Sequence, residues 1–292
     1  MKPSRQSILL LLLLPALYAG AQAPLPRRII SVSPNITEIL YGVGAFDRVV
    51  AVSDYCTYPP EVRNLPRVGG WQNSDLEKIA SLRPDLVLLT DAQAPFIQDK
   101  LRQLELRSLT VPRASLQDVF TAIELIAGVT GKEQEGRELI RRTRAKLDEV
   151  RSRTKNLPRR SVLFVIDRTP GTLQDLYAAT EGSFLVELIE IAGGRSIAEP
   201  AKIGYGRISK DAILIKNPEV IIDMVQGSIG KFGEHPELVW RDLPELRAVR
   251  QGRVYPVQNE YISHASQFVA ETAQVLARMI HPEAFPGAER NK

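Results

Sequence analysis

Aromatic side chains recur in segments expected to be loops, and they are the residues best suited to form a binding site. Tyr55, Tyr58, Trp71 and Tyr205 each follow an expected strand or precede an expected helix. In open α/β sheets, ligands bind beyond the carboxyl ends of the strands, so rings at that edge can line a cleft. Such walls suit a large, flat, partly apolar ligand. The alternative for each ring is packing against the core from its loop.

Ionisable residues offer less chemistry. The three histidines, His235, His264 and His281, form no H-x-H or H-E-x-x-H arrangement, so a zinc site has little support. An exported α/β hydrolase would have to use Asp54, Glu260 and His264 as acid and base, without a G-x-S-x-G elbow. We therefore expect no catalysis, and we keep the hydrolase as the alternative from a different class.

The composition is that of an ordinary globular protein, with 292 residues of which 44% are hydrophobic and 25% charged. The excess of 38 basic over 34 acidic residues is small and scattered, so binding to nucleic acid is not expected. Because Cys56 is the single cysteine, no internal disulfide can form. Stability must come from a packed core.

Residues 1–23 have the pattern of a secretory signal peptide. Lys2 and Arg5 precede an apolar run from Ile8 to Leu14, and Ala21-Gln22-Ala23 supplies small residues for cleavage. The apolar run is too short to cross about 30 Å of hydrocarbon as a helix. We expect cleavage after about Ala23 and export to the periplasm.

Short β-branched runs alternate with segments of helical periodicity, which is typical of an α/β fold with mostly parallel sheets. After the first run, Ser33-Pro34 precedes apolar residues at i, i+3, i+4 and i+7, which predicts a helix directly after a strand. Strands are expected at residues 29–32, 49–52, 86–89, 109–111, 162–166, 220–222 and 254–257.

A unit of helix, proline turn and strand occurs twice. Glu77 and Pro84 in the first copy correspond to Asp211 and Pro218 in the second, each pair 134 residues apart. The repeat indicates two similar lobes, which we place at residues 24–132 and 157–292. The highly charged segment 133–156 predicts one long rigid helix of about 35 Å between them. The alternative is a surface helix of a single domain.

Together these motifs resemble the periplasmic cobalamin-binding proteins of ABC importers, within the helical-backbone metal-receptor group. The resemblance spans about Arg28 to Ile280. It implies two α/β lobes joined by one long helix, with a cobalamin-like corrinoid held in the cleft between them. Its most specific parts are Ser33-Pro34-Asn35-Ile36-Thr37-Glu38, Ser53 to Pro60, Trp71-Gln72, Leu76-Glu77 and Arg83-Pro84-Asp85-Leu86-Val87.

The resemblance also implies the partners and their contacts. The ligand would be delivered to an ABC permease dimer with its ATPase subunits, so a monomeric binding protein would meet the membrane only through the permease. Glu77 and Asp211 would each pair with permease arginines. The alternative role for both is at a helix N-terminus, because Ser74 to Glu77 has capping-box spacing and Asp211 follows Ser209. Carried over by motif position, the expected ligand contacts are Pro34, Tyr58, Trp71 and Tyr205, with Tyr55 and Phe184 as looser matches.

Near the C-terminus, Glu260 and His264 stand where the resembled proteins carry a polar cluster, and His264 replaces an expected arginine. Two interpretations of His264 stay open: a contact to the corrin or axial ligand of cobalt or haem iron, and a cap of the last helix. Cys56 is the other candidate axial ligand, against the alternative of a buried inert thiol.

Two further functions remain as alternatives. A haem or ferric-siderophore binding protein of the same fold would favour an arginine-rich cleft, because those ligands often carry carboxylates, whereas the expected loops here are aromatic. A sensor or structural module of the same fold would bind no ligand, and Glu77 and Asp211 would then have no docking role.

Overall fold

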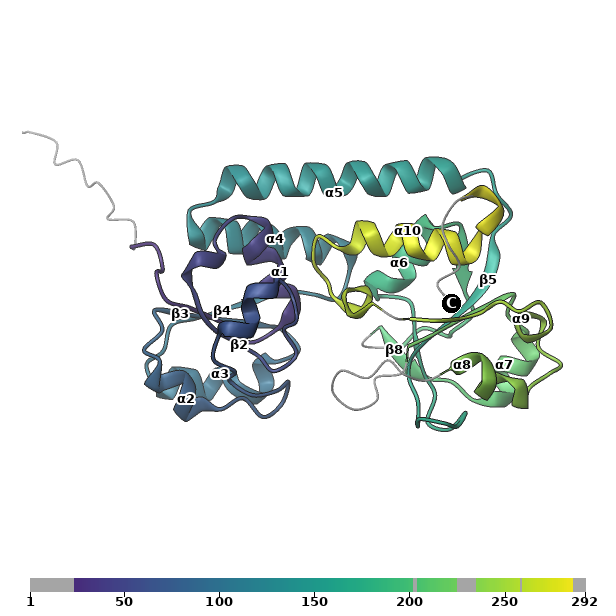
Figure 1. Ribbon diagram of the computed structural model, residues 1–292, viewed down its shortest axis with the longest axis horizontal. Coiled ribbons are helices and arrows are strands. Elements are labelled where there is room, and N and C mark those ends of the chain that lie inside the picture. The colour runs from purple at the N-terminus through teal and green to yellow at the C-terminus, as the bar shows by residue number, and fades with distance from the viewer. Residues whose placement is uncertain (1–23, 202–203, 225–234, 258, 286–292) are drawn as a thin grey trace, which may run out of the picture.

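A computed structural model describes residues 24–201, 204–224, 235–257 and 259–285. The expected signal peptide at residues 1–23 lies outside the described residues. Two α/β lobes lie side by side beneath one long helix, α5 (Glu133–Thr154), as Figure 1 shows. The two-lobe fold predicted from the sequence is confirmed.

The N-terminal lobe is built on a four-stranded, fully parallel sheet with the order β2-β1-β3-β4. All five residues of β3 are buried, as expected for a parallel strand covered on both faces. The strands are β1 (Ile29–Ser31), β2 (Val49–Val52), β3 (Leu86–Thr90) and β4 (Ser108–Val111), and the helices are α1 (Pro34–Gly42), η1 (Phe46–Arg48), η2 (Pro60–Asn64), α2 (Leu76–Ser81), α3 (Ala94–Gln103) and α4 (Leu116–Thr130).

The C-terminal lobe has a six-stranded mixed sheet. Strands β10 (Val254–Pro256), β9 (Val220–Asp223), β5 (Arg160–Asp167) and β7 (Gly194–Ser196) pair in parallel. Two further strands extend the sheet antiparallel beyond β5, β6 (Tyr177–Ala179) and β8 (Tyr205–Arg207). The helices are α6 (Phe184–Ile191), α7 (Lys210–Lys216), α8 (Pro236–Val239), η3 (Trp240–Asp242), α9 (Arg247–Arg250), η4 (Glu260–Ser263), α10 (Val269–Ile280) and η5 (Pro282–Ala284).

Every strand expected from the sequence is present, with ends shifted by at most two residues. Strands β6, β7 and β8 were not expected. Each has only three residues, none contains a β-branched residue, and one tyrosine in each of β6 and β8 is too short a signal to predict a strand. Pairing with β5 or with each other holds them in extended form.

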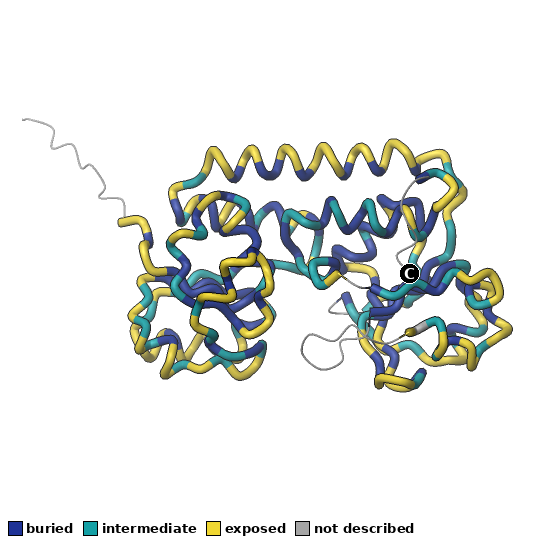
Figure 2. The backbone as a smooth tube through the Cα atoms, in the orientation of Figure 1, coloured by how far each residue is buried: buried dark blue, intermediate teal, exposed yellow. Residues whose placement is uncertain are grey.

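Helix α5 spans both lobes and has one buried face. Leu139, Ile140, Leu147 and Val150 are buried, while the outward face is charged and exposed, as the two colours of the helix in Figure 2 show. Its 22 residues give a length of about 33 Å. Among the described residues no helix combines the length and the apolar character that a membrane span requires.

The lobes share one hydrophobic core beneath α5. The same cluster of buried side chains includes Ile39 of α1, Ile126 of α4, Leu188 of α6 and Ala273 of α10. Separate clusters fill the outer faces of the two sheets. Pulling the lobes apart would expose this shared apolar surface, so the packing opposes large movements between them.

Two helical glycines give a matched test of the packing between α4 and α5. A Cβ at Gly136 would lie 2.5 Å from the Cβ of Ala127, whereas a Cβ at Gly128 would meet no atom within 4 Å. We expect Gly136→Ala to lower the free energy of unfolding by about 1 to 3 kcal/mol, through overpacking. Gly128→Ala should raise it by up to about 1 kcal/mol, through helix propensity. Urea denaturation of both variants measures the difference, and equal effects would contradict the close helix contact.

Candidate functional site

The loop after β2 is fixed by one arginine and carries Tyr55. Arg67 Nη1 donates to the backbone carbonyls of Ser53, at 2.9 Å, and Cys56, at 2.6 Å. Tyr55 is 45% exposed, and its ring lies against Gly70, where a Cβ would be 3.2 Å from Tyr55 Cε2. Tyr55 therefore lies against the turn that leads into Trp71.

Trp71 meets a residue that the sequence analysis did not single out. The guanidinium carbon of Arg113 lies 4.8 Å from the centroid of the Trp71 ring, a cation–π contact. Arg113 stands two residues after the end of β4, at the same sheet edge as the loop after β2. Arg113 directly follows Pro112 and an expected strand, and this position was the sequence signal that could have identified it as a residue at the carboxyl edge of the sheet.

The loop that contains Arg113 touches the other lobe. The backbone amide of Phe184, at the start of α6, donates to the carbonyl of Ala114 at 2.7 Å. Glu187 Oε1 accepts from the amide of Leu116 at 2.8 Å. These two hydrogen bonds form one contact between the loops at the carboxyl ends of the N-terminal strands and the C-terminal lobe.

Tyr205 lies beside this contact on the C-terminal lobe. It was expected in a loop, but it is the first residue of the edge strand β8. Gly204 has φ of +73°, and a Cβ there would lie 3.0 Å from the amide nitrogen of Ser183, the N-cap of α6. The chain just before Tyr205 therefore lies against the start of α6, and Tyr205 itself packs against the shared core.

A second contact joins the lobes through a buried carboxylate. Glu38 of α1 is only 2% exposed, and its Oε1 lies 2.6 Å from Nδ1 of His264. Its Oε2 accepts from the hydroxyl of Ser266, and its backbone carbonyl accepts from Gln267 Nε2 at 2.8 Å. His264 does not cap the N-terminus of the last helix, because Phe268 is the N-cap of α10; His264 directly follows the short helix η4. Its axial-ligand role stays a prediction.

Glu260 and Tyr58 add to the same contact between the N-terminal lobe and the segment after β10. Glu260 Oε2 accepts from Thr57 Oγ1 at 2.8 Å. The Tyr58 ring makes edge-to-face contacts with Tyr41 and Phe268, each with ring centroids 5.2 Å apart. Partial burial, and after it the neighbouring Tyr41, raises the pKa of Tyr58 above its ordinary value. Both residues therefore hold α1 and the loop after β2 against the C-terminal segment.

Two expected contacts are corrected by burial. The ring of Phe184 has no exposed surface and belongs to the shared core, so it offers no face to a ligand. Cys56 is 1% exposed, and its Sγ lies 3.2 Å from both Thr37 Oγ1 and Ser53 Oγ. It is the buried thiol of the alternative interpretation and not an open axial ligand. Pro34 is half-buried at the first position of α1.

The structure gives the hydrolase no support. His264 contacts Glu38 and Glu260 contacts Thr57, so the two do not form an acid–base pair with each other, and Asp54 is exposed. Within the described ranges, no group of three or more His, Cys, Asp or Glu side chains could hold a metal ion.

Glu77 and Asp211 occupy equivalent positions, each the second residue of a short helix. Asp75 caps α2 by accepting from the amide of Lys78, so Glu77 does not complete the capping box that its spacing suggested. Both carboxylates are exposed, and neither makes a hydrogen bond or ion pair within the described part of the chain. In Figure 1, α2 and α7 lie on the face of the molecule away from α5.

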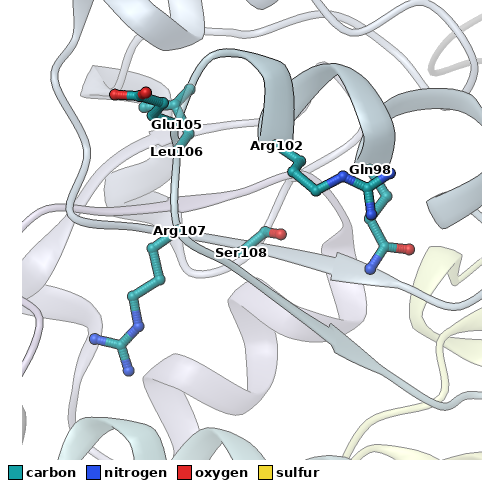
Figure 3. Close-up of a pocket in the computed structure, with 6 residues that line it drawn as sticks. All are labelled: Gln98, Arg102, Glu105, Leu106, Arg107 and Ser108. Carbon is teal, nitrogen blue, oxygen red and sulfur yellow. The ribbon is translucent and has the colours of Figure 1, made fainter.

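A surface cavity of about 320 Å³ lies at the opposite edge of the N-terminal sheet, between the end of α3 and the start of β4. Figure 3 shows the side chains around it, and most of them are exposed. Because parallel strands begin at one edge and end at the other, this cavity is separate from the group formed by Trp71 and Arg113. It is lined by Gln98, Arg102, Glu105, Leu106, Arg107 and Ser108.

The burial of Cys56 predicts a slow reaction of its thiol in the folded protein. Desolvation raises the pKa of its thiol above the ordinary value, more than the hydrogen bonds from Ser53 and Thr37 lower it. At pH 8 the folded protein should therefore react with a disulfide reagent such as DTNB at least about tenfold more slowly than the urea-unfolded chain. Rapid release of thionitrobenzoate from the folded protein would contradict the burial of this thiol.

Comparisons with known proteins agree with the fold. The model of the family described as periplasmic binding protein matches residues 29–261. The vitamin B12-binding protein of Vibrio cholerae is 29% identical over 243 residues, which are 82% of this chain and 84% of the relative. The ABC transporter substrate-binding lipoprotein YvrC of Bacillus subtilis is 28% identical over 267 residues, which are 89% of this chain and 82% of that protein.

Solved structures show the same architecture. The periplasmic vitamin B12 binding protein BtuF of Vibrio cholerae matches with a TM-score of 0.74 and 25% identity, over 90% of this chain and 99% of BtuF. The periplasmic heme-binding protein RhuT from Roseiflexus matches with a TM-score of 0.77 and 23% identity, over 88% of this chain and 99% of RhuT, and so supports the fold alone. Because the family model covers well over half of its residues, this chain belongs to the periplasmic binding protein family.

Proposed function

We propose that this protein is an exported substrate-binding protein that captures a cobalamin-like corrinoid between its lobes and delivers it to an ABC permease. The observation that supports the proposal is that Tyr55 and Trp71 lie side by side in the N-terminal lobe, and that the loop carrying Arg113, which contacts Trp71, is hydrogen-bonded to the start of α6 in the C-terminal lobe. Aromatic rings beside an interlobe contact suit a large, partly apolar macrocycle. The vitamin B12-binding relative supports the choice of ligand.

Haem is the second candidate ligand, and one observation favours it. Arg113 places a positive charge on Trp71, and haem carries two carboxylates whereas the corrin side chains are mostly uncharged amides. A haem ligand would also need an axial ligand, for which His264 is the candidate; only its Nδ1 is engaged by Glu38. The similarity to vitamin B12-binding proteins in sequence gives the corrinoid priority.

Docking to the permease is assigned to Glu77 and Asp211. Their equivalent positions on α2 and α7 place one free carboxylate on each lobe, on the face away from α5. Two exposed charges, one on each lobe, orient the encounter with the permease and raise the association rate. They add little to the affinity, because solvent and salt screen them. That balance suits a protein that must dock and then release.

Calorimetric titration of the protein lacking residues 1–23 tests the ligand. We expect one-to-one binding of cyanocobalamin that is tighter than the binding of hemin or of a ferric siderophore, measured in parallel. Binding of hemin alone would keep the transport role and replace the ligand. No binding of any of the three would refute the proposed function.

The aromatic wall has its own test. Trp71→Ala should weaken binding of cyanocobalamin by about 1 to 3 kcal/mol, because buried aromatic anchors contribute this much in other interfaces. Leu104→Ala is the control, since Leu104 is 46% exposed and directly follows α3 at the opposite sheet edge. An unchanged dissociation constant in a folded Trp71→Ala variant would remove this ring from the site.

Reversing the two docking charges should separate binding from transport. Glu77→Lys with Asp211→Lys should abolish permease-dependent uptake and leave the dissociation constant for the ligand within about twofold, because neither carboxylate contacts the site. The control is Glu124→Lys with Glu149→Lys, an equal charge change on exposed positions of α4 and α5. Normal uptake by the first variant would contradict the docking assignment.

A further inference from the structure

We propose that Arg113 is a ligand contact that recognises an anionic oxygen group, a carboxylate or a phosphodiester, on the molecule bound between the lobes. The inference rests on the proposed function, because it names a chemical feature of the same ligand. It adds a specificity-determining residue that neither the repeat nor the aromatic pattern of the sequence singles out.

Arg113 lacks a partner for its charge within the described part of the chain. Its Nε is buried and has no hydrogen-bond acceptor among the described residues, and its guanidinium carbon lies 4.8 Å from the centroid of the Trp71 ring. A buried N–H without an acceptor costs free energy comparable to a lost hydrogen bond, so native proteins rarely retain one without a purpose.

Two acids that bind the backbone of the segment after Arg113 are already engaged. Asp118 Oδ2 accepts from the amide of Ser115 at 2.9 Å, as part of the capping box of α4. Glu187 Oε1 accepts from the amide of Leu116 at 2.8 Å. Both carboxylates are held by backbone donors and neither forms an ion pair with Arg113, so its positive charge is left for another anion.

The position and orientation of Arg113 suit recognition. Arg113 adjoins Ala114, whose carbonyl accepts from Phe184 of the other lobe, so it stands at the interlobe junction. The guanidinium carbon lies over the Trp71 ring, 4.8 Å from its centroid. Nε is buried but the two Nη groups are not among the buried unpaired atoms, so the Nη groups are the donors that can make a bidentate contact to an oxyanion.

The test compares an anionic with a neutral member of two ligand pairs. Cobinamide lacks the nucleotide loop of cobalamin, including its phosphodiester, and excess cyanide gives both the same axial ligands. Hemin carries carboxylates that its dimethyl ester lacks. Each pair is titrated by calorimetry into the wild type, Arg113→Gln and Arg107→Gln. Arg107 is the control, because it stands directly before β4 whereas Arg113 stands just after it, at the opposite edge of the sheet.

We expect Arg113→Gln to weaken binding of the anionic member of the pair about tenfold or more, and the neutral member by less than about twofold. Retained binding of the neutral member shows that the variant is folded, and Arg107→Gln should change neither. A loss confined to cobalamin identifies a phosphodiester as the group that Arg113 recognises, and a loss confined to hemin identifies a carboxylate. Unchanged binding of the anionic ligand, or equal losses for both members, would overturn the inference.

Failure of the proposed function leaves the inference testable. If the wild type binds none of the four ligands, the deciding measurement is a titration with inorganic phosphate, followed by tryptophan fluorescence. A saturable change in the wild type and in Arg107→Gln that is lost in Arg113→Gln would uphold an anion contact beside Trp71. No change in the wild type, or the same change in Arg113→Gln, would overturn it.

Discussion

The buried carboxylate of Glu38 is the interaction on which the relation between the lobes depends. A carboxylate that is 2% exposed is tolerated only when its oxygens are hydrogen-bonded, and here His264 and Ser266 supply both partners. Glu38 belongs to α1, which starts where β1 ends, and its partners follow β10 of the other sheet. One side chain therefore ties the carboxyl ends of the two sheets together.

The other interlobe contact gives this arrangement its second fixed point. Where Phe184 donates to Ala114, the start of α6 is held against the loop after β4, and the ring of Phe184 enters the shared core. With contacts at both points and a continuous core beneath α5, the two lobes are held in one arrangement. Preorganised walls bind a rigid ligand with little loss of conformational entropy.

The proposed binding and docking residues of the N-terminal lobe lie on successive segments of the chain. Trp71 and Arg113 stand in loops beyond the carboxyl ends of β2 and β4, and Glu77 is the second residue of α2, the helix that follows the loop containing Trp71. Under the proposed function, the Trp71 ring would suit any flat macrocycle, and the charge of Arg113 would discriminate between ligands with and without an anionic group.

Local pattern in the sequence was enough to predict the parallel strands, α5 and the equivalence of Glu77 with Asp211, because hydrophobic periodicity and turn residues act between near neighbours. It also placed Tyr55 and Trp71 in neighbouring loops. Only the tertiary structure decided that Phe184 turns inward, that Arg113 lies on Trp71, and that His264 binds Glu38 across 226 residues. Those outcomes depend on which surfaces meet when the lobes pack, and no local pattern records the direction in which a side chain then points.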